Sequence, residues 1–217
     1  MKLYSGGFSR FFLDDWQEES GNASSNDTSV DDDEATPDQV RRYFEAFKSE
    51  LATAISENSP ITLDWSEALD GPHYVVTLTE EEFGALLTIA ARVAIADRRM
   101  TPISTSRKWH EDPAVIAVQD VDENYLPVHH LVKADSWLPA DFGVIIETEV
   151  PERDLIFGSL AQMADALKAM HPILNTPNEA TRKLSTQLVS DARTAHLALK
   201  QIVDWAKTHK MPILIEP

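Results

Sequence analysis

Cysteine is absent from the 217 residues of the sequence. Disulfide bonds, thiolate catalysis and zinc sites with cysteine ligands are therefore excluded. Glycine is scarce as well: the seven glycines form neither a G-x-G-x-x-G pattern nor a P-loop, so the sequence has neither of these phosphate-binding loops. No apolar run approaches the roughly 18 residues of a membrane-spanning helix, and the first residues lack an apolar stretch of signal-peptide length. We therefore expect a soluble, cytoplasmic protein that does not contact membranes.

Positive charge is missing from one long segment. Residues 14–38 contain ten Asp or Glu residues and neither Lys nor Arg, within a chain whose formal net charge is -17. Residues 20–36 also have almost no apolar side chain to bury, so their composition predicts a mobile loop. Direct binding to a nucleic acid backbone depends on clustered cations and is not expected. The electrostatic complement of such a chain is a basic protein.

The remaining sequence predicts helices and strands in an irregular order. Thr36 and Gln39 form a capping box before a helix with an apolar stripe, and Thr79 and Glu82 form another before a helix over 80–99. Further helices are predicted over 152–170, where His171-Pro172 ends the helix, and over 177–209. The predicted strands are 2–5, 61–65, 73–78, 114–119, 125–132, 144–150 and the final MPILIE stretch.

This order lacks regular alternation of strands and helices, so we predict an α+β fold. Its mixed or antiparallel sheet would pack against about four helices, including the long C-terminal helix. We divide the chain into two parts. Residues 1–36 hold an N-terminal strand and the acidic segment, and residues 37–217 form a single globular core.

Imidazole and carboxylate side chains concentrate between residues 109 and 130. The candidate metal ligands there are His110, Asp120, Asp122 and His129. Together these groups could bind Zn, Mn or Fe, although their spacing matches no diagnostic motif. His129 and His130 are adjacent, so in the predicted strand they would point to opposite faces and could not readily share one metal. The structural alternative is a solvated turn with one partly buried histidine.

The acidic segment provides the candidate partner-binding residues. They are Trp16, Glu18, Glu19, Asp31, Asp32, Asp33 and Glu34. An aromatic side chain among carboxylates could anchor on a basic, partly apolar surface. Alternatively, Trp16 folds back onto the domain with the nearby phenylalanines, as most large apolar side chains do.

No complete catalytic set is evident, so we expect a binding protein that needs no cofactor. The leading interpretation is a soluble acidic module, such as an immunity protein or antitoxin, that occludes a basic partner. The first alternative is an enzyme with a metal-dependent or acid–base site around residues 109–130. The second is a structural subunit that forms homo-oligomers through the helix over 177–209.

Overall fold

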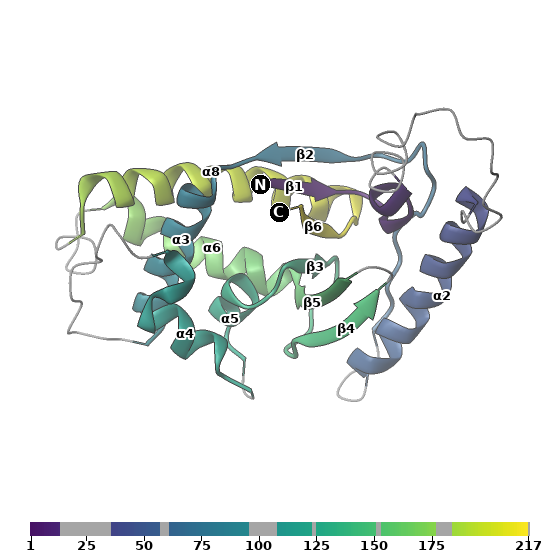
Figure 1. The fold of residues 1–217 in the computed structure, drawn as a ribbon, viewed down its shortest axis with the longest axis horizontal. Coiled ribbons are helices and arrows are strands. Elements are labelled where there is room, and N and C mark those ends of the chain that lie inside the picture. The colour runs from purple at the N-terminus through teal and green to yellow at the C-terminus, as the bar shows by residue number, and fades with distance from the viewer. Residues whose placement is uncertain are drawn as a thin grey trace, which may run out of the picture.

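A computed structural model describes residues 1–13, 36–56, 61–95, 108–122, 125–150, 153–176 and 184–216 (Figure 1). The strands in these ranges are β1 (Lys2–Ser5), β2 (Tyr74–Thr77), β3 (Ser136–Leu138), β4 (Ile146–Val150), β5 (Arg153–Ser159) and β6 (Ile213–Glu216). The helices are α2 (Pro37–Ser56), α3 (Glu80–Ala94), the 3-10 helix η1 (Trp109–Glu111), α4 (Pro113–Gln119), α5 (Pro127–Val132), α6 (Leu160–Asn175) and α8 (Thr186–His209). Residues 8–13 are helical as well.

The strands form one sheet in the order β2-β1-β6-β3-β5-β4. β1 is antiparallel to both of its neighbours, with Lys2 opposite Thr77 of β2 and Glu216 of β6. β3 is antiparallel to β6 and parallel to β5, and β4 is antiparallel to β5. The sheet is therefore mixed, and the predicted α+β fold with a long C-terminal helix is confirmed.

Different helices cover the two faces of this sheet, because successive side chains of a strand point to opposite faces. In β1 and β3, Leu3 and Trp137 join the core that contains α3, α6 and α8. Their neighbours Tyr4 and Leu138 join a second, aromatic core with α2 and residues 8–13. Figure 1 shows α2 on the right, apart from α3, α4 and α5 on the left. Every helix in the described ranges is too short or too polar to cross a membrane.

Side chains at the helix starts explain where several helices begin. The Thr79 hydroxyl accepts the Glu82 N–H at 3.1 Å, and the Glu82 carboxylate accepts the Thr79 N–H at 2.9 Å, which confirms the predicted capping box. Asp112 caps α4 by accepting the Ala114 N–H at 2.9 Å. The other carboxylate oxygen of Asp112 pairs with Arg92 of α3 at 2.6 Å, and both side chains are buried. This ion pair fixes α4 against α3.

Two predicted strands are helices. Residues 114–119 belong to α4 and residues 127–132 form α5, so the predicted strands 114–119 and 125–132 are wrong. Pro113 and Pro127 occupy first-turn positions of these helices, where the missing proline N–H costs nothing. The prediction of a helix from 152 is wrong in its first part, because residues 153–159 form β5. The helix also continues through Pro172 to Asn175 instead of ending before the proline.

Residues 61–65, predicted as a strand, form no strand ladder. Instead they lead into a buried polar bridge around Glu67, whose side chain is 1% exposed. The Glu67 carboxylate accepts the Ser9 N–H at 2.8 Å and the indole N–H of Trp65. Lys48 of α2 donates to the Trp65 carbonyl at 2.9 Å. This bridge ties residues 8–13, the segment after residue 61 and α2 together.

Helix α8 packs against α3, α6 and β2. Its apolar stripe is therefore used within the chain, while Leu197 on another face is 59% exposed. Residues 177–183 of the predicted long helix lie outside the described ranges, and oligomerisation through it stays a prediction. The proposed division of the chain at residue 36 also stays a prediction, because residues 14–35 are not described either.

Candidate functional site

All seven candidate partner-binding residues lie outside the described residues. They are Trp16, Glu18, Glu19, Asp31, Asp32, Asp33 and Glu34. The described residues just before them are firmly packed: Phe8, Phe11 and Phe12 are 0%, 5% and 2% exposed. The acidic segment is thus connected to the aromatic core at its N-terminal end and to α2 at its C-terminal end.

The four candidate metal ligands occupy different local environments. His110 is exposed on η1, Asp120 is exposed at the end of α4, and Asp122 is exposed two residues later. His129 is buried in α5, and its Nδ1 accepts the Leu126 N–H at 2.6 Å. Burial, and then the charge of Lys133, lowers the pKa of His129. Within the described ranges no group of three or more His, Asp or Glu side chains could hold a metal ion, so the metal site rests on composition alone.

His130 lies at the centre of a buried polar cluster. It is not among the four candidate metal ligands predicted from the sequence, where it appears only as the neighbour of His129. Its side chain is 0% exposed, and its Nδ1 accepts the Ser159 N–H at 3.0 Å. The indole N–H of Trp137 donates to the His130 carbonyl at 2.6 Å. Burial, followed by the charge of His129, lowers the pKa of His130 to about 4, although Gly143 and Asp141 act in the opposite direction. His130 is therefore a neutral hydrogen-bond acceptor at pH 7.

The Ser159 hydroxyl has a structural role. It donates to the Ala140 carbonyl at 2.7 Å and accepts the Gln162 N–H at 3.3 Å, so it caps the start of α6. The side chain is fully buried. The hydrogen bond between these two residues joins the backbone N–H of Ser159 to Nδ1 of His130. In the described residues, the Ser159 Oγ is not bonded to the imidazole. This pair is therefore not arranged as a nucleophile and its base.

The hairpin of β4 and β5 carries an acidic outer face. Glu149 lies directly opposite Asp154, and both side chains are exposed. Glu147 is exposed on the same face of β4, two residues away, where it lies opposite Ile156. Two like charges directly opposite each other destabilise a sheet. This face therefore sacrifices some stability and presents three carboxylates to solvent.

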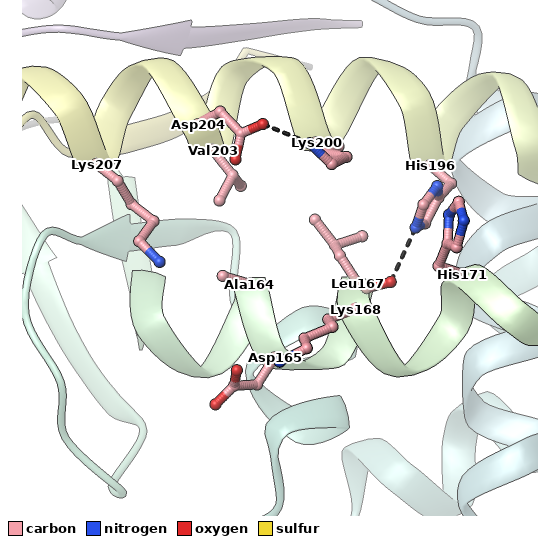
Figure 2. A pocket seen from close by; sticks show the side chains of 10 residues that line it. All are labelled: Ala164, Asp165, Leu167, Lys168, His171, His196, Lys200, Val203, Asp204 and Lys207. Atoms are coloured by element: carbon pink, nitrogen blue, oxygen red, sulfur yellow. Dashed lines mark hydrogen bonds and ion pairs between the residues drawn. The ribbon is translucent and has the colours of Figure 1, made fainter.

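A cavity of about 480 Å³ lies between α6 and α8 (Figure 2). Its apolar lining includes Ala164 and Leu167 of α6 and Val203 of α8. Polar residues of both helices surround this lining: Asp165, Lys168, His171, His196, Lys200, Asp204 and Lys207. Lys200 and Asp204 form an ion pair at 2.6 Å. The cavity thus combines an apolar floor with a rim of charged and imidazole groups.

His196 is held in one orientation at the end of this cavity. The ring is 2% exposed, and its Nε2 lies 2.8 Å from the Leu167 carbonyl oxygen, as the dashed line in Figure 2 shows. Because a carbonyl oxygen can only accept, Nε2 carries the proton of this hydrogen bond. The His171 ring lies nearby, with ring centroids 5.6 Å apart. Burial lowers the pKa of His196, His171 and Lys200 lower it further, and the Leu167 carbonyl partly opposes them.

No protein-family model matches the sequence, and no curated protein or solved structure is significantly similar to it. Functional conclusions therefore depend on the charges and the geometry of this chain.

Sequence reasoning missed the cavity, although part of a signal was present. On α8, His196, Lys200, Val203 and Lys207 recur at spacings of four, three and four residues, which places them on one side of a helix. On α6, Ala164, Leu167 and His171 follow the same rule. The pairing of these two helical faces is a tertiary relationship that the spacing within either helix does not predict.

Proposed function

We propose that this chain is a non-catalytic module that binds a basic protein through its acidic surface. The observation that supports the proposal best is the charge asymmetry of residues 14–38, which hold ten acidic residues and neither Lys nor Arg. The concrete form of the proposal is an immunity protein or antitoxin that occludes a basic toxin, such as a nuclease. Complementary charge would speed association, and the occlusion itself would be steric.

The acidic hairpin face of β4 and β5 is consistent with the same function. Glu149 and Asp154 repel each other across the strands, and that repulsion falls when a cation lies between them. A basic partner that contacts this face would therefore recover part of the lost stability. We infer that the hairpin face contributes to partner binding beside the acidic segment.

The test begins with affinity capture from the native source at low salt, followed by identification and purification of the captured protein. Association kinetics are then measured with the wild type and with a variant in which Asp31, Asp32, Asp33 and Glu34 become Asn or Gln. We expect the association rate constant to fall about tenfold in the variant at low salt, and to fall in the wild type as salt is added.

The matched control removes the same number of charges elsewhere. Its four substitutions are Asp64→Asn, Asp70→Asn, Glu111→Gln and Asp122→Asn, all at exposed positions. Its rate constant should stay within about twofold of the wild type, because steering depends on where the charge lies. Equal losses in both variants, or association that salt leaves unchanged, would show that the acidic segment does not direct binding.

A further inference from the structure

The cavity between α6 and α8 differs in charge from the rest of the molecule. Residues 160–217 contain seven Lys or Arg residues and five Asp or Glu residues, although the whole chain has a formal net charge of -17. Three of those cations, Lys168, Lys200 and Lys207, line the cavity together with two histidines, and the lining holds two carboxylates, Asp165 and Asp204. A local excess of cations around a concave site attracts anions, because the low-dielectric walls concentrate the field.

Two of the three lysines are available to a ligand. Lys200 is paired with Asp204. By contrast, Lys168 and Lys207 make no ion pair or side-chain hydrogen bond with any other described residue. Figure 2 shows the Lys207 side chain extending from α8 towards α6, where Lys168 is located. Both lysines line the cavity, one from each helix, so an anionic group at the rim would face cations from α6 and α8.

The cavity lining defines the rest of the ligand. Ala164, Leu167 and Val203 provide an apolar surface, and the volume of about 480 Å³ lies within the range of small-molecule sites. A simple inorganic anion would leave this surface in contact with water. An organic anion with an apolar body would cover it and gain the corresponding hydrophobic free energy.

We propose that the α6–α8 cavity binds a small organic anion, in which a carboxylate or phosphate group is attached to an apolar or aromatic body. The body lies against Ala164, Leu167 and Val203, and the anionic group meets Lys168 and Lys207 at the rim. His196 forms the fixed end wall of the site. This site is independent of the basic partner proposed above and lies on different elements from the acidic hairpin.

The first experiment uses two fluorescent probes with similar aromatic bodies. Anilinonaphthalenesulfonate carries an anionic group, whereas phenylnaphthylamine does not. We expect the anionic probe to bind the folded protein about tenfold more tightly than the neutral one. In methyl NMR spectra its shifts should concentrate on Ala164, Leu167 and Val203. Equal affinity for both probes, or shifts scattered over other elements, would overturn the proposal.

Substitutions separate the two parts of the site. The Lys168→Gln, Lys207→Gln variant should bind the anionic probe about tenfold more weakly, while a Lys108→Gln, Lys210→Gln control with exposed lysines outside the cavity should bind as the wild type does. Val203→Phe should weaken both probes, because its ring fills the cavity. Circular dichroism verifies that each variant is folded. Unchanged binding in the lysine variant would refute the proposed anion recognition.

An acidic peptide tests whether the ligand of the cavity needs an apolar body. Hexaglutamate carries several carboxylates but no apolar body. If it displaces the anionic probe at concentrations no higher than those of a small aromatic carboxylate, the cavity is a docking site for acidic peptides and the proposal is wrong. If the aromatic carboxylate displaces the probe and hexaglutamate does not, the proposal is supported.

Discussion

The Nδ1 atom of His130 accepts the backbone N–H of Ser159 at 3.0 Å, which joins the buried helix α5 to the start of α6. Gly158 makes this approach possible, because a Cβ atom there would lie 3.3 Å from Nδ1 and 2.9 Å from the Ala134 methyl group. Protonation of Nδ1 would place two donors face to face and a charge in the core. The fold therefore holds His130 in its neutral form.

This arrangement predicts a loss of stability in acid. The pKa of His130 is about 4 in the folded chain and 6.5 in its ordinary state, so the unfolded chain binds more protons between these values. The free energy of unfolding should fall as pH drops from 6.5 to 4, by about 3 kcal/mol from this residue. In His130→Asn the amide oxygen can still accept the Ser159 N–H but cannot titrate. Urea unfolding at pH 7 and pH 4 should show a smaller loss in the variant. The same pH dependence in both proteins would contradict the assignment.

Exchanging one carboxylate oxygen of Glu67 for an NH2 group should destabilise the fold. Each of its carboxylate oxygens accepts one N–H, from Ser9 and from Trp65. In Glu67→Gln one oxygen becomes an NH2 group, so one buried N–H loses its acceptor and faces another donor, and the free energy of unfolding should fall by about 1–3 kcal/mol. The control Glu50→Gln lies on the exposed face of α2 and should change it by less than about 0.5 kcal/mol. Chemical denaturation measures both, and equal effects would show that the polar bridge is not important.

The pH dependence of the same pair tests the burial of Glu67. Burial raises the pKa of Glu67. The hydrogen bonds from Ser9 and Trp65 and the charge of Lys48 lower the pKa, but the effect of burial is larger. The folded chain therefore holds this proton to higher pH than the unfolded chain does, and stability falls as pH rises from 4.5 through the raised pKa. Glu67→Gln should remove that part of the profile. A profile unchanged by the substitution would show that Glu67 titrates normally.

The ion pair between Arg92 and Asp112 should contribute mainly through the cost of breaking it. Asp112→Asn keeps an oxygen that can cap α4 but removes the carboxylate charge that pairs with the buried Arg92, so the free energy of unfolding should fall by about 3 kcal/mol. Adding Arg92→Met should recover most of that loss, because the pair is then replaced by apolar contact. A thermal or chemical double-mutant cycle measures the coupling. A loss below about 0.5 kcal/mol in the single variant would contradict the burial of the pair.

Replacing one acidic residue of the β4–β5 hairpin face by lysine should stabilise the protein. Glu149→Lys would place a cation opposite Asp154 and should raise the free energy of unfolding by about 0.2–1 kcal/mol at low salt, with a smaller gain at high salt. Glu147→Lys is the matched control, because it changes the same charge on the same face but lies opposite Ile156. The control should gain less. Equal gains would mean that net charge, and not the cross-strand pair, limits stability.

Much of the fold follows from local sequence signals. The capping boxes at Thr36 and Thr79 give correct starts for α2 and α3. A different start signal stands at Asp112-Pro113, where an N-cap residue precedes a proline, but the β-branched residues after it favour a strand. A short apolar run fits either a buried strand or a buried helix, and here the packing of α4 against α3 decides for the helix. The strand predicted over 114–119 is therefore wrong, whereas the predicted start of α2 is correct.

The candidate sites show a different limit. His129 and His130 were separated by strand geometry, yet they lie in a helix, and each Nδ1 binds a backbone N–H. The partner of His130 is 29 positions away in the sequence, so no local pattern could reveal it. The cavity likewise depends on the packing of α6 against α8. Sequence spacing identifies the face of one helix, whereas a site needs two faces brought together.

The central position of β6 in the sheet affects both the synthesis of the chain and its sensitivity to proteolysis. It joins β1 on one side to β3 on the other, so without residues 213–216 the sheet would split into a two-stranded ribbon and a three-stranded remnant. An isolated two-stranded ribbon is marginal in water. During synthesis β1 therefore waits for residues 213–216 before its second edge is covered, and a protease that removes only those residues would divide the sheet.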